Sequence, residues 1–181
     1  MLSEKINRLK NMLFNDQLAW SRQSGVPFIL IAVSPIEQLY IQPKLEEVQR
    51  DGQTQGYQVA IVNIEELLYQ LLIKVENGDL TEIYEFEKND YPEFIEEMQS
   101  TMLKLLYEWI LEKAEQLGTN GRILFTRVGS TAPHFRFIQL LSKLENKVSI
   151  PLCFFIPGTV SSTRFIMLDD IDISGSRAFY L

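Results

Sequence analysis

RILFTRVGSTAPHFRFIQLLSKLENKVSIPLCFFIPG, residues 122–158, predicts a strand, a turn and a helix that lead into a second strand. The first apolar run, residues 123–126, is too short and too aromatic for a helix. The middle segment instead carries apolar side chains at steps of three or four residues, namely Phe135, Ile138, Leu141 and Leu144. Pro133 fits a first helical position, where a missing N–H costs nothing, and Ser130 or Thr131 can cap the free amides.

The second strand of this stretch, residues 150–156, is apolar almost throughout. Such a run is typical of a parallel strand that is covered on both faces. Pro151 is expected at its start, because proline cannot donate to a central ladder, and Pro157-Gly158 is expected to end it in a turn. The stretch therefore predicts a βαβ crossover.

The rest of the chain extends this pattern in both directions. Further buried strands are predicted at residues 26–33 and 60–62. Helices are predicted at 2–13, from either Pro35 or Pro43 to an Asp51-Gly52 turn, after the cap Asn63, and at 92–117. Residues 164–168 and 177–181 are expected to add short antiparallel strands. The predicted fold class is α/β: a doubly wound, mostly parallel sheet with helices on both faces and a short C-terminal antiparallel strand pair.

Composition limits the classes of protein to consider. At 181 residues the chain is long enough for one substantial core, so residues 1–181 are expected to form a single domain. The net charge of −7 works against direct nucleic-acid binding. Neither an export signal nor a run of about 18 apolar residues is visible, so we expect a cytoplasmic protein without a membrane span. The single cysteine, Cys153, lies inside an apolar run and is expected to be a buried thiol.

Signatures of catalysis are scarce in this sequence. The glycine patterns of phosphate-binding loops and dinucleotide folds are missing, and one histidine with one cysteine cannot form a zinc tetrad. We therefore expect no enzyme, no cofactor and no metal. Asp169, Asp170 and Asp172 follow a predicted strand, and they fit either a hydrophilic turn or a carboxylate metal site of a hydrolase. The acidic and aromatic residues 76–90 fit either a solvated face or a protein-docking surface.

A candidate crevice is predicted beyond the carboxyl ends of the strands, where ligands bind in open α/β sheets. Polar residues and turn glycines of the 122–158 stretch and of the C-terminal strands would meet there: Arg127, Gly129, Ser130, His134, Arg136, Pro157, Gly158, Arg164 and Arg177. A helix start at this edge also offers free N–H groups to an anion. Simpler explanations remain open, since the glycines fit backbone turns, His134 fits an exposed helix start, and the two C-terminal arginines can pair with nearby aspartates.

The sequence resembles a known family at several short motifs, which are residues 27–31, 63–68, 128–129 with Pro133 and Arg136, 155–158 and 177–179. It is similar to the BrxB family, formerly a domain of unknown function, whose best-known member is a component of BREX bacteriophage-exclusion systems. The resemblance covers nearly the whole chain in order. It implies a small, cytoplasmic, non-catalytic subunit that contacts the alkaline-phosphatase-like PglZ protein and other BREX components. It transfers no catalytic residues.

Two functional hypotheses follow from these observations. The first is an adaptor or scaffold subunit of a phage-defence complex, supported by the resemblance and by the strongly apolar helix at residues 92–117, one side of which could also meet a second copy of this chain. The second is a degenerate nucleotide- or nucleic-acid-binding domain that uses the strand-end crevice near Gly129 and Pro157.

Overall fold

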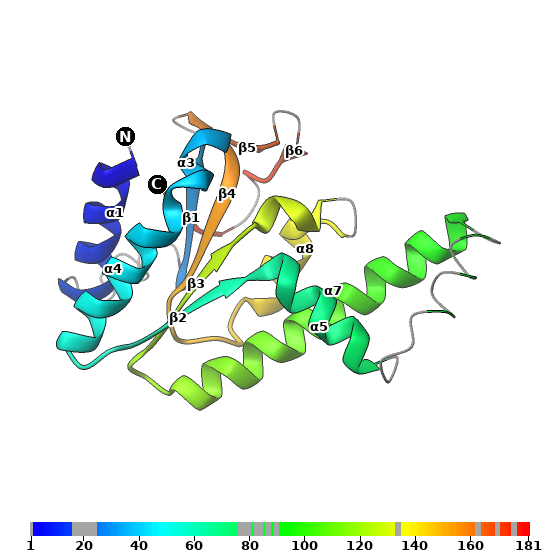
Figure 1. The fold of residues 1–181 in the computed structure, drawn as a ribbon, viewed down its shortest axis with the longest axis horizontal. Coiled ribbons are helices and arrows are strands. Elements are labelled where there is room, and N and C mark those ends of the chain that lie inside the picture. Colours follow the sequence, from blue (N-terminus) through cyan, green and yellow to red (C-terminus); the bar gives the residue numbers. More distant parts are fainter. Residues whose placement is uncertain are drawn as a thin grey trace.

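The computed structural model describes residues 2–15, 25–75, 81, 85, 88, 91–132, 135–161, 164–168, 171–174 and 177–181. Within them a seven-stranded sheet has the order β2-β3-β4-β1-β7, and β5 and β6 continue from β4 (Figure 1). The strands are β1 (Phe28–Val33), β2 (Gln58–Asn63), β3 (Gly121–Thr126), β4 (Leu152–Ser161), β5 (Arg164–Met167), β6 (Ile171–Asp172) and β7 (Phe179–Tyr180). The pairs within the main order are all parallel, whereas β5 is antiparallel to β4 and β6. The predicted α/β fold class is confirmed.

Helices cover both faces of the sheet (Figure 1). On one side are α1 (Leu2–Lys10), which continues into the π-helix η1 (Asn11–Asn15), and α4 (Ile41–Thr54). On the other are α5 (Ile64–Val75), α7 (Tyr91–Leu117) and α8 (Phe137–Leu144). Side chains of β1 alternate between the two cores, with Phe28 and Leu30 in one and Ile29 and Ile31 in the other. This double burial explains why the strand is apolar at every position.

The long helix α7 helps to close the second face of the sheet, which is one of the two arrangements that fit its broad apolar surface; contact with another chain is the other. Met102, Leu103, Leu106 and Ile110 are buried, and most of its other described apolar side chains are partly buried against the same core. None of its described residues is among the strongly exposed large hydrophobic ones. The helix ends at Leu117, and Gly118 follows it with a positive φ of 61°, which confirms the prediction that this glycine ends the helix. The breadth of its apolar stripe is therefore explained by α5, α8 and the sheet.

The βαβ unit is present, but its helix begins later than predicted. After β3 the chain forms a short 3-10 turn, η2 (Val128–Thr131), and α8 starts only at Phe137, with Arg136 as its N-cap residue. The Ser130 hydroxyl donates to the Arg127 carbonyl at 2.6 Å, and the Thr131 hydroxyl donates to the Val128 carbonyl at 2.7 Å. These hydroxyls are therefore donors within the turn and do not cap α8. Pro133 and His134 lie outside the described residues.

The predicted turn at Pro157-Gly158 is wrong, because β4 continues to Ser161. Pro157 is the last residue opposite β1, and from Gly158 onward the same strand pairs with β5. The C-terminal antiparallel pairing is confirmed for β5, with β4 and β6 as its partners. Residues 177–181 differ from the prediction, because β7 is parallel to β1. The Ala32 amide donates to the Leu181 carbonyl at 2.9 Å and the Leu181 amide donates to the Leu30 carbonyl at 2.9 Å, which fixes the chain end to this strand.

The helix choice after β1 is resolved in favour of both starts, since α3 (Pro35–Leu39) and α4 follow one another. The predicted turn at Asp51-Gly52 is wrong. Gly52 is a buried helical residue, and an added Cβ would lie 2.6 Å from Val59 Cγ2 and 2.9 Å from Phe14 Cζ. The glycine therefore allows α4 to approach the sheet and η1 closely.

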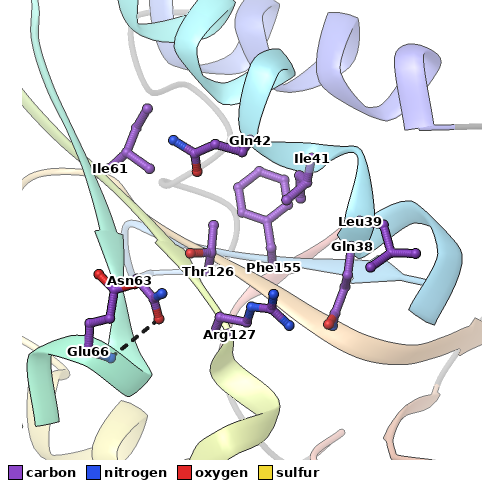
Figure 2. A pocket seen from close by; sticks show the side chains of 10 residues that line it. All are labelled: Gln38, Leu39, Ile41, Gln42, Ile61, Asn63, Glu66, Thr126, Arg127 and Phe155. Atoms are coloured by element: carbon purple, nitrogen blue, oxygen red, sulfur yellow. Dashed lines mark hydrogen bonds between the residues drawn. The ribbon is translucent and has the colours of Figure 1, made fainter. Parts of the chain in front are cut away.

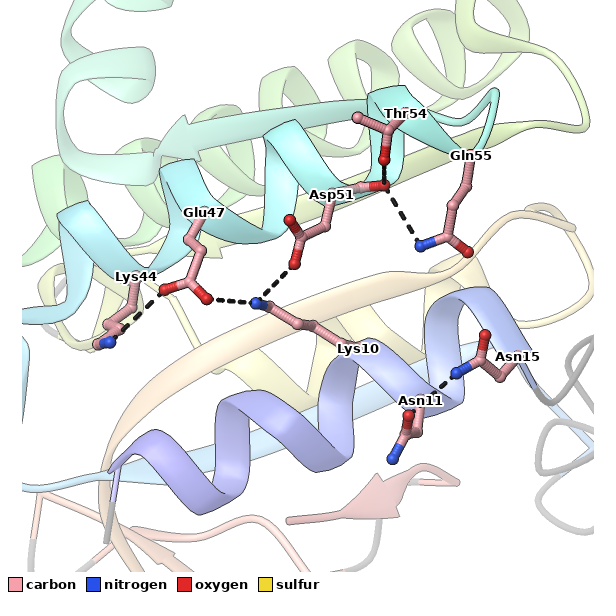
Figure 3. Close-up of polar contacts among 8 residues, drawn as sticks. All are labelled: Lys10, Asn11, Asn15, Lys44, Glu47, Asp51, Thr54 and Gln55. Carbon is pink, nitrogen blue, oxygen red and sulfur yellow. Dashed lines mark hydrogen bonds and ion pairs between the residues drawn. The ribbon is translucent and has the colours of Figure 1, made fainter.

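An ion-pair cluster holds α1 on α4 (Figure 3). The Lys10 ammonium lies 2.6 Å from a Glu47 carboxylate oxygen and 2.7 Å from one of Asp51, and its side chain is only 16% exposed. Burial by itself lowers the pKa of Lys10, but the hydrogen bonds to Asp51 and Glu47 outweigh it, and the pKa is raised above its ordinary value of 10.5. The pairs therefore stabilise the fold while Lys10 is protonated and the carboxylates are ionised. The contribution is lost as pH rises through the raised pKa of Lys10, and also as pH falls through the pKa of Glu47, which the hydrogen bond from Lys10 lowers.

Replacing Lys10 with methionine should lower the free energy of unfolding by about 1 kcal/mol at neutral pH, because the apolar stem is kept while both ion pairs are removed. Lys44→Met is the matched control. Lys44 pairs with Glu47 at 3.5 Å along the surface of one helix, and its side chain is 42% exposed. Urea denaturation at low and high salt measures both variants. An equal loss for the two lysines would contradict the anchoring role of Lys10.

Candidate functional site

A crevice of about 480 Å³ lies where the carboxyl ends of β2 and β3 face α3 and α4 (Figure 2). Its wall on the sheet side carries Ile61 and Phe155, and Ile41 adds an apolar contact from α4. Polar side chains come from both sides, with Gln38 and Gln42 on α3 and α4, and Asn63, Thr126 and Arg127 at the strand ends, next to Glu66 in the first turn of α5. The helix after β1 covers one face of the sheet and those after β2 and β3 cover the other, which leaves an opening between them.

Several of these polar groups already have partners within the chain. The Asn63 side-chain oxygen accepts hydrogen bonds from the amides of Glu65 at 3.1 Å and Glu66 at 3.4 Å, which confirms its role as the cap of α5. The Thr126 hydroxyl donates to the Val62 carbonyl at 3.4 Å, and the Gln42 amide donates to Glu46 at 3.1 Å. The polar lining is therefore partly structural.

Arg127 is the positively charged residue of the crevice. Its backbone is left-handed, with φ 57° and ψ 29°, a conformation that costs a non-glycine residue about 1–2 kcal/mol. The strain persists because the Arg127 carbonyl accepts the Ser130 amide at 3.1 Å and the Ser130 hydroxyl at 2.6 Å. Figure 2 shows its guanidinium directed toward Gln38. In the part of the chain that the structure describes, no carboxylate lies within ion-pair distance of it.

The other sequence-predicted site residues do not line the crevice, as far as they are described, and the prediction that Arg177 joins them at this edge is wrong, because it precedes β7, which runs parallel to β1 and pairs with the amino-terminal part of that strand. Gly129 is packed on Pro157, since an added Cβ would lie 2.6 Å from the Pro157 ring. Gly158 is packed on the backbone of β5. Arg136, Arg164 and Arg177 are exposed at the start of α8, at the start of β5 and before β7. His134 lies outside the described residues.

Sequence reasoning missed Gln38, Gln42 and Asn63 as crevice residues. The sequence identifies Asn63 only as a cap, and it does not place the two glutamines, because it allows a helix start after β1 at either Pro35 or Pro43. The position of these residues just after the predicted strands could have identified them. Side chains just after the first and second strands of a parallel sheet lie at the same edge as those after the third.

Cys153 and Asp172 carry side chains that could react or bind a metal, but their surroundings give each a structural role. Cys153 is buried in β4, as predicted, and burial raises the pKa of its thiol far above the ordinary value of 9.0. Hydrogen bonds from Ser174 and then the charge of Arg164 hold the pKa of Asp172 below its ordinary value. Within the described residues no group of three or more His, Cys, Asp or Glu side chains is placed to hold a metal ion. Asp169, Asp170 and most of residues 76–90 lie outside them.

An exposed apolar patch borders the crevice. It consists of Ile36, Leu39 and Tyr40, which are 70%, 70% and 66% exposed. Their spacing of three and four residues places them on one face of α3 and its C-cap. We call Ile36, Leu39 and Tyr40 the α3 patch. Leu39 belongs both to this patch and to the lining of the crevice.

α3 is held in place although it has no buried residue. A capping box closes its start, with the Glu37 amide donating to the Ser34 hydroxyl at 3.2 Å and the Ser34 amide donating to the Glu37 carboxylate at 2.9 Å. Lys5 donates to the Ala32 carbonyl at 2.6 Å and lies 3.7 Å from Glu37. Burial tends to raise the pKa of Glu37, but the Ser34 hydrogen bonds and Lys5 lower it, so the cap remains formed at neutral pH.

Comparison with known proteins gives one family. The sequence model of the family described as "BREX protein BrxB" matches residues 60–181, which is 122 of 181 residues. No curated protein and no solved structure matches the chain. The described helices include none with the length and apolar character needed to span a bilayer.

Proposed function

The chain belongs to the BREX protein BrxB family and is thus a component of a BREX bacteriophage-exclusion system, and from this premise we propose that it is a non-catalytic, cytoplasmic adaptor that binds a PglZ-like protein. Other BREX components would then assemble on the pair. The family match supports the process, and the surface of the chain supports the mode of action.

The observation that carries this proposal is the α3 patch. Three large apolar side chains on one helical face remain in water, although the helix itself is fixed by a capping box and by Lys5. Isolated exposed apolar residues are common on proteins, but a contiguous group on a fixed element is typical of an interaction surface. A preformed surface also reduces the ordering cost of binding.

The non-catalytic part of the proposal is supported by the buried Cys153 thiol, which is held in its protonated form and cannot reach a substrate from inside β4. It is further supported by the polar crevice residues Asn63 and Thr126, whose hydrogen bonds serve the start of α5 and the β2–β3 pair.

Co-purification with the PglZ-like protein tests the adaptor role. The tagged full chain and the PglZ-like protein from the same BREX system are expressed together, and we expect them to elute as one complex in size-exclusion chromatography. If the chain elutes alone while the remaining components assemble normally without it, the adaptor proposal is wrong.

A nucleotide-binding role is the second candidate, and the Arg127 crevice of about 480 Å³ is the observation that favours it. A nucleotide at about 100 times its Kd would add about 2.7 kcal/mol of stability. Thermal-shift measurements with a panel of nucleotides test this role directly. A flat response would count against it.

A further inference from the structure

We propose that the α3 patch and Arg127 together form a docking surface for an acidic segment of the partner protein, in which a partner carboxylate pairs with Arg127 inside the crevice while a neighbouring apolar side chain packs on Ile36, Leu39 and Tyr40. This inference rests on the adaptor function proposed above, and it specifies the chemistry of the partner.

The apolar half of this surface follows from its geometry. Ile36, Leu39 and Tyr40 lie on one face of α3, and Leu39 connects them to the crevice. Figure 2 shows Leu39 and Gln38 on the same short helix that faces Arg127 across the opening. An extended segment lying over α3 would therefore reach the crevice within a few residues, since each residue spans about 3.3 Å.

The charged half follows from Arg127. Arg127 lines the crevice from an exposed position directly after β3, and among the described residues no carboxylate forms an ion pair with its guanidinium. Glu66 is the acidic residue of the lining, but it lies at the start of α5 and beyond ion-pair distance. A planar guanidinium binds a carboxylate through two parallel hydrogen bonds, and partial removal from water strengthens that pair.

Charge complementarity favours an acidic segment over a basic one. The complementarity is local, because the chain as a whole carries a net charge of −7: the Arg127 guanidinium, which has no ion pair among the described residues, gives a carboxylate one defined position at the crevice. The apolar patch beside the crevice favours a polypeptide over a free small anion, because a free anion would leave Ile36, Leu39 and Tyr40 in water.

Affinity measurements between the full chain and its PglZ-like partner test the docking surface. Arg127→Glu and Leu39→Asp should each weaken the complex at least tenfold. Arg50→Glu and Tyr69→Asp are the matched controls, since both residues are exposed on α4 and α5 away from the crevice, and they should retain wild-type affinity. All four positions are exposed, so the variants are expected to fold, and circular dichroism is the check of their folding.

Salt dependence provides a second readout. The wild-type complex should weaken more than the Arg127→Gln complex when salt is raised from 0.1 M to 0.5 M, because only the wild type has the guanidinium–carboxylate pair. Each outcome is decisive. If wild type fails to bind the partner, the adaptor function fails and the docking surface with it. If wild type binds and Arg127→Glu and Leu39→Asp bind equally well, the docking surface is wrong and the adaptor function stands. Stabilisation by ATP or inorganic phosphate that Arg127→Glu abolishes would assign the crevice to a free anion and overturn the inference.

Discussion

Replacing Arg122 with methionine should lower the free energy of unfolding by about 3 kcal/mol. Arg122 is 4% exposed, and its Nε donates to the Leu13 carbonyl at 3.2 Å. One terminal nitrogen donates to the carbonyls of Thr119 at 3.3 Å and Gly121 at 2.7 Å. The guanidinium carbon also lies 4.4 Å from the centre of the Tyr57 ring. Arg122 thus joins η1, the turn before β3 and the residue that precedes β2.

The loss is large because the acceptors stay behind. The acceptors of Arg122 are carbonyl groups, and its removal takes a donor from those of Leu13 and Gly121, whose hydrogen bonds to Arg122 are buried, at about 1–3 kcal/mol each. Burial lowers the pKa of Arg122, which means that the charge itself is costly, and relief of that cost offsets part of the loss. A net change of about 3 kcal/mol should lower Tm by roughly 6–12 °C.

Two further variants make this result interpretable. Arg122→Lys keeps the charge but provides a single nitrogen, so it should recover part of the stability and not all of it. Arg50→Met removes an exposed arginine on α4 and should change the free energy of unfolding by less than about 0.5 kcal/mol. Calorimetry on the three proteins measures the differences. A loss for Arg122→Met no greater than for Arg50→Met would show that the buried guanidinium does not hold these elements together.

The central strands of the sheet could be predicted because a strand that is buried on both faces is apolar at every position. Residues 28–33 and 152–156 are apolar at every position, and each set divides between the two cores as a covered parallel strand requires. The cap Asn63 was equally readable, since its side chain acts on amides two and three residues away. A contact between residues so close in the sequence can be predicted from the local sequence alone.

The structural roles of the glycines were predicted less well, because glycine is required both where φ is positive and where another segment leaves no space for a Cβ. Gly118 and Gly56 have positive φ and do form turns. Gly52 and Gly158 have no positive φ and are glycines because another segment approaches too closely for a Cβ. A sequence cannot separate these cases, since the neighbour lies elsewhere in the chain. The Pro157-Gly158 pair was interpreted as a turn for this reason, although it lies within β4.

The candidate site was predicted in part. Arg127 lines the crevice because the strand-end rule applies to β3, whereas Gln38 and Leu39 could not be placed without knowing which of two prolines starts a helix. Apolar side chains at helical spacing also predict which face of a helix is apolar, but they do not show whether that face is buried. The apolar surface of residues 92–117 fits either burial against the sheet or contact with another chain, and it is largely buried within the chain, whereas Ile36, Leu39 and Tyr40 are exposed. Exposure depends on whether another element covers the helix, and local sequence does not record that.

Replacing Gly158 with alanine should cost about 3 kcal/mol and loosen β5. An added Cβ would lie 2.1 Å from the Ile166 carbonyl oxygen and 3.0 Å from the Met167 Cα. Both contacts are backbone atoms of the paired strand, so no side-chain rotation can relieve them and the strands must separate. Separation would withdraw the buried side chains of Phe165 and Met167 from the core. Denaturant unfolding together with amide hydrogen exchange in β5 measures both effects.

The control is Gly56→Ala, which separates lack of space from backbone strain. Gly56 has φ +83° and nothing within 4 Å of an added Cβ, so alanine there should cost only the left-handed conformation, about 1 kcal/mol. Gly129→Ala should fall between the two, because the nearest atom, 2.6 Å away, belongs to the Pro157 ring, a side chain that can shift slightly. The expected order of destabilisation is therefore Gly158, Gly129, Gly56. If Gly158→Ala costs no more than Gly56→Ala, and exchange in β5 is unchanged, β4 and β5 do not pair as closely as this contact requires.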